Sequence, residues 1–154
     1  MQKRRKRTNS NIPAKGRLRD IADRLWSHAV RNDWAWECAV CRSGKVEAHH
    51  IIPRQQEATR YDLRNGIALC TTHHKFDSQL APHQNSVGWC KWLQENYPCT
   101  YVWVFKQLVG GNRFSGTKNA AYLCDVIRGL RQYVEPEDFE RIVGVRFSQW
   151  LAEN

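Results

Sequence analysis

Four residues of the chain have the types and the spacing of a structural zinc site. They form two close pairs, Cys38 with Cys41 and Cys70 with His73, and 28 residues separate the pairs. Zinc in such sites takes four tetrahedral nitrogen or sulfur ligands. In a cytosolic chain, a Cys-x-x-Cys pair indicates a metal site rather than a disulfide. We therefore expect one structural zinc per chain, with two unrelated pairs in a core as the alternative.

A second set of polar residues lies inside or against this frame and comprises His49, His50, Asn65 and His74. Neutral imidazole suits a general base because its pKa is near working pH, and it is also a common metal ligand. Adjacent strand residues point to opposite faces, so we expect a bend or bulge to make His49 and His50 converge on one phosphate. Taken alone, the histidine pair could be a satisfied core pair and Asn65-Gly66 a plain turn.

The ordered combination of these patterns resembles the HNH endonucleases, the His-Me finger or ββα-metal family. Residues 47–53 read Glu-Ala-His-His-Ile-Ile-Pro, and residues 65–74 read Asn-Gly-Ile-Ala-Leu-Cys-Thr-Thr-His-His. Within that family the pattern is similar to small phage and prophage proteins with a built-in zinc. Trp26-Ser27 and residues 60–63, Arg-Tyr-Asp-Leu, belong to the same pattern.

The resemblance implies a role for each residue of the second set. His50 matches the general base, and His49 and His74 match ligands of a catalytic divalent metal, with Mg or Mn expected. Asn65 matches the asparagine that braces the loop between the strands. The implied activity is hydrolysis of DNA phosphodiester bonds to 5′-phosphate and 3′-hydroxyl ends, by nicking or double-strand cleavage.

The sequence departs from the family pattern at two positions. The second zinc pair usually reads Cys-x-x-Cys-His, whereas here it reads Cys70-x-x-His73-His74; by chain position we assign His73 to zinc. Some members have a further histidine one turn after the His74 position, where this chain has Ser78. Asp77, His83 or water would then complete the catalytic metal site.

The biological setting that the resemblance implies is phage DNA packaging or recombination, with proteins of those complexes as further partners. The chain could act as a monomer or a homodimer. Two alternatives stay open: a zinc-stapled DNA-binding or scaffold protein without turnover, and a nuclease specific for branched DNA.

Charge is concentrated at the N-terminus. Residues 1–19 hold eight Lys or Arg and no acid, whereas residues 20–154 hold 16 basic against 15 acidic residues. A basic arm on a nearly neutral body fits a nucleic-acid partner, with a solubilising tail as the alternative. Guanidinium also matches phosphate oxygens, and Arg60 is our first candidate for a phosphate contact in the motif loop. The full set of candidate DNA contacts is Arg60, Arg54, Arg64, Lys3, Arg4, Arg5, Lys6 and Arg7.

Length and composition predict one globular domain with an appendage. The 154 residues are 42% hydrophobic and include seven tryptophans, which argues against wholesale disorder. No apolar run reaches the roughly 20 residues of a membrane span, and no secretory h-region follows the basic start. We expect a cytoplasmic protein, in the host cytoplasm if phage-encoded. Cys90, Cys99 and Cys124 are expected to be ordinary, mostly buried thiols, and His28 an inert residue on a polar helix face.

The elements around the motif are predicted to run helix, β-hairpin, helix. Apolar spacing predicts a helix over 18–31, and β-forming segments predict strands over 46–52 and 66–69. A helix capped by Thr71 or Thr72 should run to about residue 80. The fold class we expect is α+β, a zinc-stapled ββα-metal core with an N-terminal helix and a mainly helical C-terminal extension.

Beyond the motif, the pattern predicts a helix over 87–97, a strand over 101–105 and a helix over 118–133. A last helix should begin near Pro136, with Gly144 as a weak point inside it. We therefore divide the chain into a flexible basic arm (1–16), a nuclease domain (17–97, motif core 38–80) and a C-terminal extension (98–154).

Overall fold

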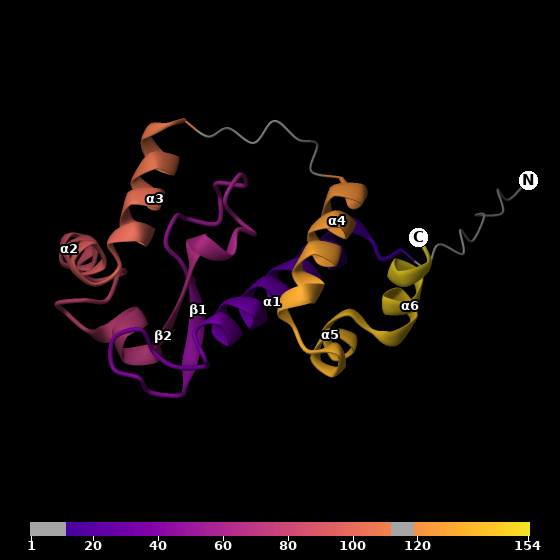
Figure 1. Ribbon diagram of the computed structural model, residues 1–154, viewed down its shortest axis with the longest axis horizontal. Helices are drawn as coiled ribbons and strands as arrows, with labels where there is room; N and C mark the ends of the chain where they lie inside the picture. Colours follow the sequence, from indigo (N-terminus) through magenta and orange to yellow (C-terminus); the bar gives the residue numbers. More distant parts are fainter. Residues whose placement is uncertain (1–11, 112–118) are drawn as a thin grey trace, which may run out of the picture.

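The computed structural model describes residues 12–111 and 119–154, and in them it contains a two-stranded sheet surrounded by helices (Figure 1). The basic residues Lys3 to Arg7 lie outside the described part. The elements follow in the order α1 (Lys15–Asp33), β1 (Val46–His50), η1 (Leu63–Asn65), β2 (Gly66–Cys70), η2 (Thr72–Phe76), α2 (Ser86–Asn96), α3 (Pro98–Val109), α4 (Ala120–Leu130), η3 (Arg131–Tyr133), α5 (Pro136–Val143) and α6 (Val145–Glu153). The α+β class is confirmed.

Helix α1 lies between the hairpin and the C-terminal helices (Figure 1). Its apolar residues recur at helical spacing and are at most 4% exposed, so the predicted helix is confirmed. One core joins α1 to α4, α5 and α6, with Leu25, Ile127 and Phe139 among its most buried members. His28 was expected to lie on a polar face, and this is wrong. It is 6% exposed, and its Nε2 lies 3.1 Å from Oδ2 of Asp138 on α5.

The predicted hairpin is confirmed, with β1 antiparallel to β2. Val46 pairs with Cys70 at one end and His50 with Gly66 at the other. A Cβ built on Gly66 would lie 2.2 Å and 2.9 Å from the two methyl carbons of Val30 and 3.1 Å from the Trp26 ring. Helix α1 therefore packs directly on the backbone of β2, which only glycine allows at this position.

A second core joins the cysteine segment to β2 and α2. Its buried members include Cys38, Ile67 and Leu69 from the motif and Trp89 and Leu93 from α2. The predicted helix over 87–97 is confirmed as α2. It begins where the side chain of Asn85 accepts a hydrogen bond from the Gly88 amide at 2.8 Å.

The strand predicted over 101–105 is wrong, because this segment lies inside helix α3. Pro98 occupies its first turn, where a missing N–H costs nothing. Val104 is 9% exposed, whereas Val102 and Phe105 are 48% and 55% exposed. A strand would place Val102 and Val104 on the same face. Helical packing against α2 and η1 thus overrides the β propensity of the sequence.

Three smaller expectations are also wrong. The last helix is two helices, since Gly144 has a φ of +90° and separates α5 from α6. The helix expected after β2 is a single π-helical turn, η2, and the side chain of Thr71 does not cap it. Asp77 follows this turn, and its side chain accepts hydrogen bonds from the amides of Gln79 and Leu80 at 2.8 Å. Cys90 and Cys99 are exposed, and only Cys124 of that trio is buried.

Among the described residues, no helix is long and apolar enough to cross a membrane. The division of the chain at residues 16 and 97 stays a prediction.

The close approach of α1 to β2 predicts a specific sensitivity at Gly66. Gly66→Ala should destabilise the protein by about 1–3 kcal/mol, because the new methyl group overlaps Val30. Urea unfolding measures the loss. The matched control is Gly129→Ala in α4, where nothing lies within 4 Å of the new Cβ and helix propensity should add about 0.5–1 kcal/mol of stability. Equal effects of the two substitutions would contradict the packing described here.

Candidate active site and metal centres

Three cysteines and one histidine converge between the first loop and the end of β2. The ligand atoms of Cys38, Cys41, Cys70 and His73 all lie within 4.8 Å of one another. The Sγ atoms of Cys41 and Cys70 are 3.8 Å apart, and Nδ1 of His73 lies 3.7 Å from Sγ of Cys38 and 3.2 Å from Sγ of Cys70. Tetrahedral zinc with Zn–S near 2.3 Å requires S–S edges of about 3.8 Å. The donor set therefore fits zinc.

The local backbone fixes the first half of this cluster. The Cys38 amide donates to the Ser43 carbonyl at 2.9 Å, and the Arg42 amide donates back to the Cys38 carbonyl at 2.9 Å. Arg42 closes this tight turn with a φ of +62°. The Ala39 amide bonds the Ala68 carbonyl at 2.9 Å, which ties the turn to β2.

The cluster also favours thiolate at Cys38. Burial alone would raise the pKa of this thiol, but backbone hydrogen bonds from Cys70, Cys41 and Val40 and the His73 side chain lower it to about 7. Thiolate is the form that binds metal.

Three histidines form a separate cluster on the other side of η2. Nδ1 of His49 lies 3.0 Å from Nε2 of His74, which lies 3.3 Å from Nε2 of His83. An octahedral divalent ion with ligand distances of about 2.0–2.1 Å requires edges of about 2.9 Å. The three nitrogens therefore have the spacing of a metal site.

His83, rather than Asp77, joins His49 and His74. The carboxylate of Asp77 accepts backbone bonds from residues 79 and 80, and its Oδ2 lies 3.9 Å from Nε2 of His73. The consecutive residues His73 and His74 thus face different clusters, His73 the cysteines and His74 the histidines.

Glu47 orients His74 and had no role in the sequence prediction. Its Oε2 accepts from Nδ1 of His74 at 2.7 Å, and Lys75 binds the same carboxylate at 2.8 Å. A carboxylate only accepts, so Nδ1 carries the hydrogen and Nε2 presents its lone pair to the cluster. The available signal was strand periodicity, because Glu47 lies two residues before His49 on the same face of β1.

His49 is held neutral. Burial, followed by the neighbouring imidazoles of His74, His83 and His50, lowers its pKa to about 3. A neutral imidazole is the form that can bind a metal.

His50 points to the opposite face of β1, toward α1. Its ring stacks on Trp26 with centroids 3.6 Å apart, whereas His49 contacts His74, His83 and Trp89. The register of the hairpin is uninterrupted through both residues, so of the expected bend or bulge there is no bulge. A bend follows directly, at Ile51 and Ile52. The ladder ends at His50, and the two side chains flank this strand end.

The environment of His50 fixes one tautomer. Its Nε2 lies 2.9 Å from the Arg60 carbonyl, which can only accept, so Nε2 donates and Nδ1 keeps a lone pair. Burial lowers the pKa of His50 and favours this neutral form. Trp26 covers one ring face and is itself fixed by a 3.1 Å bond to the Asp62 carbonyl.

Asn65 braces the loop that carries the Arg60 carbonyl. Its Oδ1 accepts from the Ile52 amide at 2.7 Å, and its Nδ2 donates to the carbonyls of Ile52 and Thr59 at 3.0 Å and 3.1 Å. The side chain is completely buried. The loop is thereby pinned next to both His50 and Arg60.

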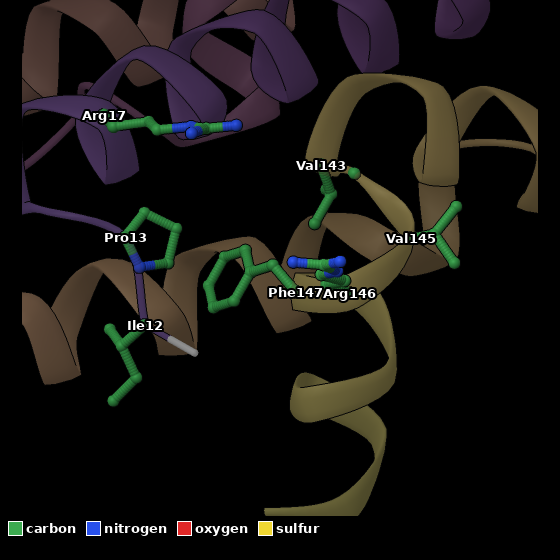
Figure 2. Close-up of a pocket in the computed structure, with 8 residues that line it drawn as sticks. Ile12, Pro13, Arg17, Val143, Val145, Arg146 and Phe147 are labelled. Carbon is green, nitrogen blue, oxygen red and sulfur yellow. The ribbon is translucent and has the colours of Figure 1, made fainter. Parts of the chain in front are cut away.

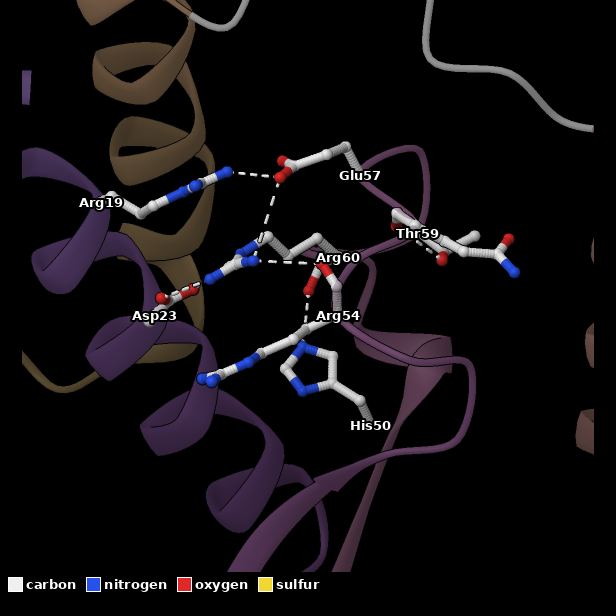
Figure 3. A network of polar contacts seen from close by, with 8 residues as sticks. Arg19, Asp23, His50, Arg54, Glu57, Thr59 and Arg60 are labelled. Carbon is white, nitrogen blue, oxygen red and sulfur yellow. Dashed lines mark hydrogen bonds and ion pairs between the residues drawn. The ribbon is translucent and has the colours of Figure 1, made fainter. Parts of the chain in front are cut away.

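Arg60 has a structural partner where a phosphate contact was expected. The residue is 7% exposed. Its guanidinium binds Asp23 of α1 through two bonds of 3.0 Å and 2.6 Å and the Arg54 carbonyl through a third of 3.0 Å (Figure 3). Glu57 lies 3.9 Å away and binds Arg19 as well. The guanidinium of Arg60 is thus bound to α1, and the residue positions the carbonyl that lies against His50. A phosphate contact by Arg60 stays a prediction.

The side chains of the other two loop arginines, Arg64 and Arg54, differ in their contacts and exposure. Arg64 binds Asp62 at 2.6 Å and stacks over the Trp103 ring at 4.9 Å. Arg54 is exposed, and Figure 3 shows its side chain beside His50. Arg54 is the arginine of this loop best placed to meet a phosphate.

The family model described as HNH endonuclease matches residues 38–80. The chain contains an HNH endonuclease domain. The matched segment holds both cysteine pairs, His49, His50, Asn65 and His74, and it ends just before His83. Comparisons with curated proteins and with solved structures found no match. The HNH domain supports assignment of the chain to the nucleases, and no relative extends that assignment to a substrate.

The histidine cluster predicts which residue completes the second metal site. His83→Ala should weaken Mn²⁺ binding by about tenfold or more, because one of three imidazole ligands is removed. Titration of zinc-loaded protein with Mn²⁺, followed by electron paramagnetic resonance, measures the change. The matched control, Asp77→Asn, keeps an acceptor for the amides of residues 79 and 80 and should bind Mn²⁺ normally. A larger loss of affinity in the control would assign the site to Asp77.

Proposed function

We propose that this protein is a metal-dependent DNA endonuclease that hydrolyses phosphodiester bonds with His50 as general base. One observation carries the proposal: the imidazole of His50 is held between Trp26 and the Arg60 carbonyl, next in the chain to His49 of the histidine cluster. A base and a metal site on the two faces of one strand end could act on the same phosphate.

The chain's own residues define the base. Nε2 of His50 is committed to the Arg60 carbonyl, so Nδ1 is the nitrogen that accepts the proton of the attacking water. Asn65 pins the loop at Ile52 and Thr59, and Asp23 holds Arg60 from α1. The ring can therefore neither rotate nor exchange its tautomer without breaking these contacts, and this preorganisation supports a catalytic role.

His49, His74 and His83 would hold a divalent metal, and Mg or Mn is the expected ion. When bound, such an ion neutralises charge on the phosphate and stabilises the leaving oxygen. Glu47 keeps Nε2 of His74 directed into the cluster.

Cys38, Cys41, Cys70 and His73 would hold one structural zinc per chain. The tetrahedral spacing of their ligand atoms supports this assignment. The ion would join the first loop to the end of β2 and the start of η2, and its binding energy would contribute to folding.

DNA is the proposed substrate, with Arg54 as a phosphate contact beside the base and the basic residues Lys3 to Arg7 as a further contact outside the described residues. A monomer with one active site would cut one strand and so nick the duplex. Double-strand cleavage would need two such cuts or a homodimer. The resemblance of the motif to small phage proteins supports DNA packaging or recombination as the setting, in the host cytoplasm.

Plasmid nicking by wild type and His50→Ala, each with Mg²⁺ and Mn²⁺, tests the proposal. His50→Ala should reduce the nicking rate by about 10²–10⁴-fold, since the proton acceptor is removed. The control is Gln132→Ala in η3, an exposed residue whose side chain bonds the Gly129 carbonyl and which belongs to neither the histidine nor the cysteine cluster. It should nick at the wild-type rate.

Thermal melting of each variant separates loss of the base from loss of the fold. Undiminished nicking by folded His50→Ala would refute the assignment of the base. Folded wild-type protein that binds DNA without nicking under either metal would instead support a binding or scaffold role. Preferential cutting of a four-way junction over plasmid would assign the protein to the structure-specific nucleases.

A further inference from the structure

Five arginines line the seam between α1 and the junction of α5 with α6. Arg17, Arg24 and Arg31 come from α1, and Arg141 and Arg146 come from α5 and α6. All five lie outside the segment matched by the HNH model. None belongs to the histidine or cysteine clusters.

The three α1 residues recur every seven positions. Seven residues make almost two turns of an α-helix, so Arg17, Arg24 and Arg31 share one face and follow each other at about 10.5 Å. The row is therefore about 21 Å long. Along B-DNA, that length covers about six charges of one strand at 3.4 Å each.

Two hollows succeed one another along this row. The first is lined by Ile12, Pro13, Arg17, Arg146 and Phe147, and Figure 2 shows the two arginines on opposite sides of it. The second is lined by Arg24, Arg31, Trp36 and Arg141. Arg24, Arg141 and Arg146 are exposed, and Trp36 is 38% exposed beneath Arg31, whose guanidinium lies 4.7 Å from the ring centroid.

The positive charge of the seam is only partly neutralised. Among the described residues, Arg17, Arg24 and Arg146 have no carboxylate within ion-pair distance. Asp23, the one acid lining the second hollow, is bound by Arg60. Asp138 binds Arg141 and His28. Asp20 is exposed one turn before Arg24 but lines neither hollow.

The seam is connected to the candidate active site and to the basic N-terminus. Asp23 lines the second hollow and holds Arg60, whose carbonyl holds His50. Trp26, which stacks on His50, belongs to the same helix. At the other end, Ile12 lines the first hollow and directly follows the sequence that contains Lys3 to Arg7.

We propose that this seam binds the sugar-phosphate backbone of duplex DNA along α1, on the face of the helix opposite to Trp26. The proposal rests on the proposed function, in which DNA is the substrate, and it assigns the α5–α6 junction a part in substrate binding. Guanidinium groups pair with phosphate oxygens without reading sequence, so the seam adds affinity and register rather than base preference. Trp36 provides an aromatic surface at the Arg31 end.

Duplex binding by a triple variant tests the seam. Arg17→Gln, Arg24→Gln and Arg146→Gln remove the three exposed seam arginines that lack ion pairs among the described residues. The His50→Ala background allows binding to be measured without cleavage. The Kd for a 20-base-pair duplex, from fluorescence anisotropy at several salt concentrations, should rise roughly tenfold or more. The slope of log K against log salt should fall by about 2–3, since each phosphate that is no longer neutralised contributes about 0.9.

The control triple Lys91→Gln, Lys106→Gln and Arg128→Gln has the same net charge but changes α2, α3 and α4. It should change Kd less than about threefold, because charges beyond roughly 8–10 Å are screened. A triple variant with Arg17→Lys, Arg24→Lys and Arg146→Lys should keep most of the wild-type affinity, because its positive charge is retained. Equal losses of affinity in the two triples, or an unchanged salt slope in the seam triple, would overturn the proposal.

The outcome is independent of the cleavage test. If wild-type protein fails to nick but the seam triple loses duplex affinity as described, the seam stands and the catalytic proposal falls. If wild type nicks and the seam triple binds the duplex with unchanged affinity, the seam proposal falls and the catalytic one stands.

Discussion

Direct packing of α1 on Gly66 is the contact on which the rest of the structure depends. Because β2 has no side chain at that position, Val30 and Trp26 approach its backbone, and Trp26 reaches the ring of His50 on the paired strand. The same approach brings Asp23 to the buried guanidinium of Arg60, whose other carboxylate partner, Glu57, lies 3.9 Å away. Helix α1, which lies outside the matched HNH segment, thus covers one face of the His50 ring through Trp26. Through Asp23 it also binds Arg60, whose carbonyl accepts the hydrogen bond of His50.

The end of β2 divides the candidate metal ligands between two clusters. Cys70 completes the strand, His73 turns to the cysteines and His74 turns to His49 and His83. The single wide turn η2 makes this possible, because consecutive residues on it project in different directions. The sequence predicted a helix capped by Thr71 or Thr72 that runs to about residue 80, and this turn ends at Phe76 instead. Glu47 and Lys75 then fix His74 from the neighbouring strand and turn.

The convergence of Cys38, Cys41, Cys70 and His73 could be predicted from spacing, because zinc motifs are local in sequence and restrictive in chemistry. Helix α1 and the hairpin could be predicted from periodicity. The partners of Arg60 and His28 could not, since Asp23 and Asp138 meet them only after α1 docks on the loop and on α5. Residues 101–105 are of types that favour β-strands, yet they are helical and their buried positions follow helical spacing. The reason is that they pack against α2 rather than against a third strand. His83 is nine residues beyond His74 in the sequence, and only the path of the chain after η2 brings its ring back to that of His74.

The proposed chemistry depends on two ions in separate ligand sets on either side of η2. Anomalous-difference maps from crystals grown with manganese, recorded on both sides of the zinc and manganese absorption edges, locate each ion. We expect a zinc peak among Cys38, Cys41, Cys70 and His73, and a manganese peak among His49, His74 and His83. A single shared peak, or manganese bound at Asp77 and away from His83, would contradict this division of the ligands.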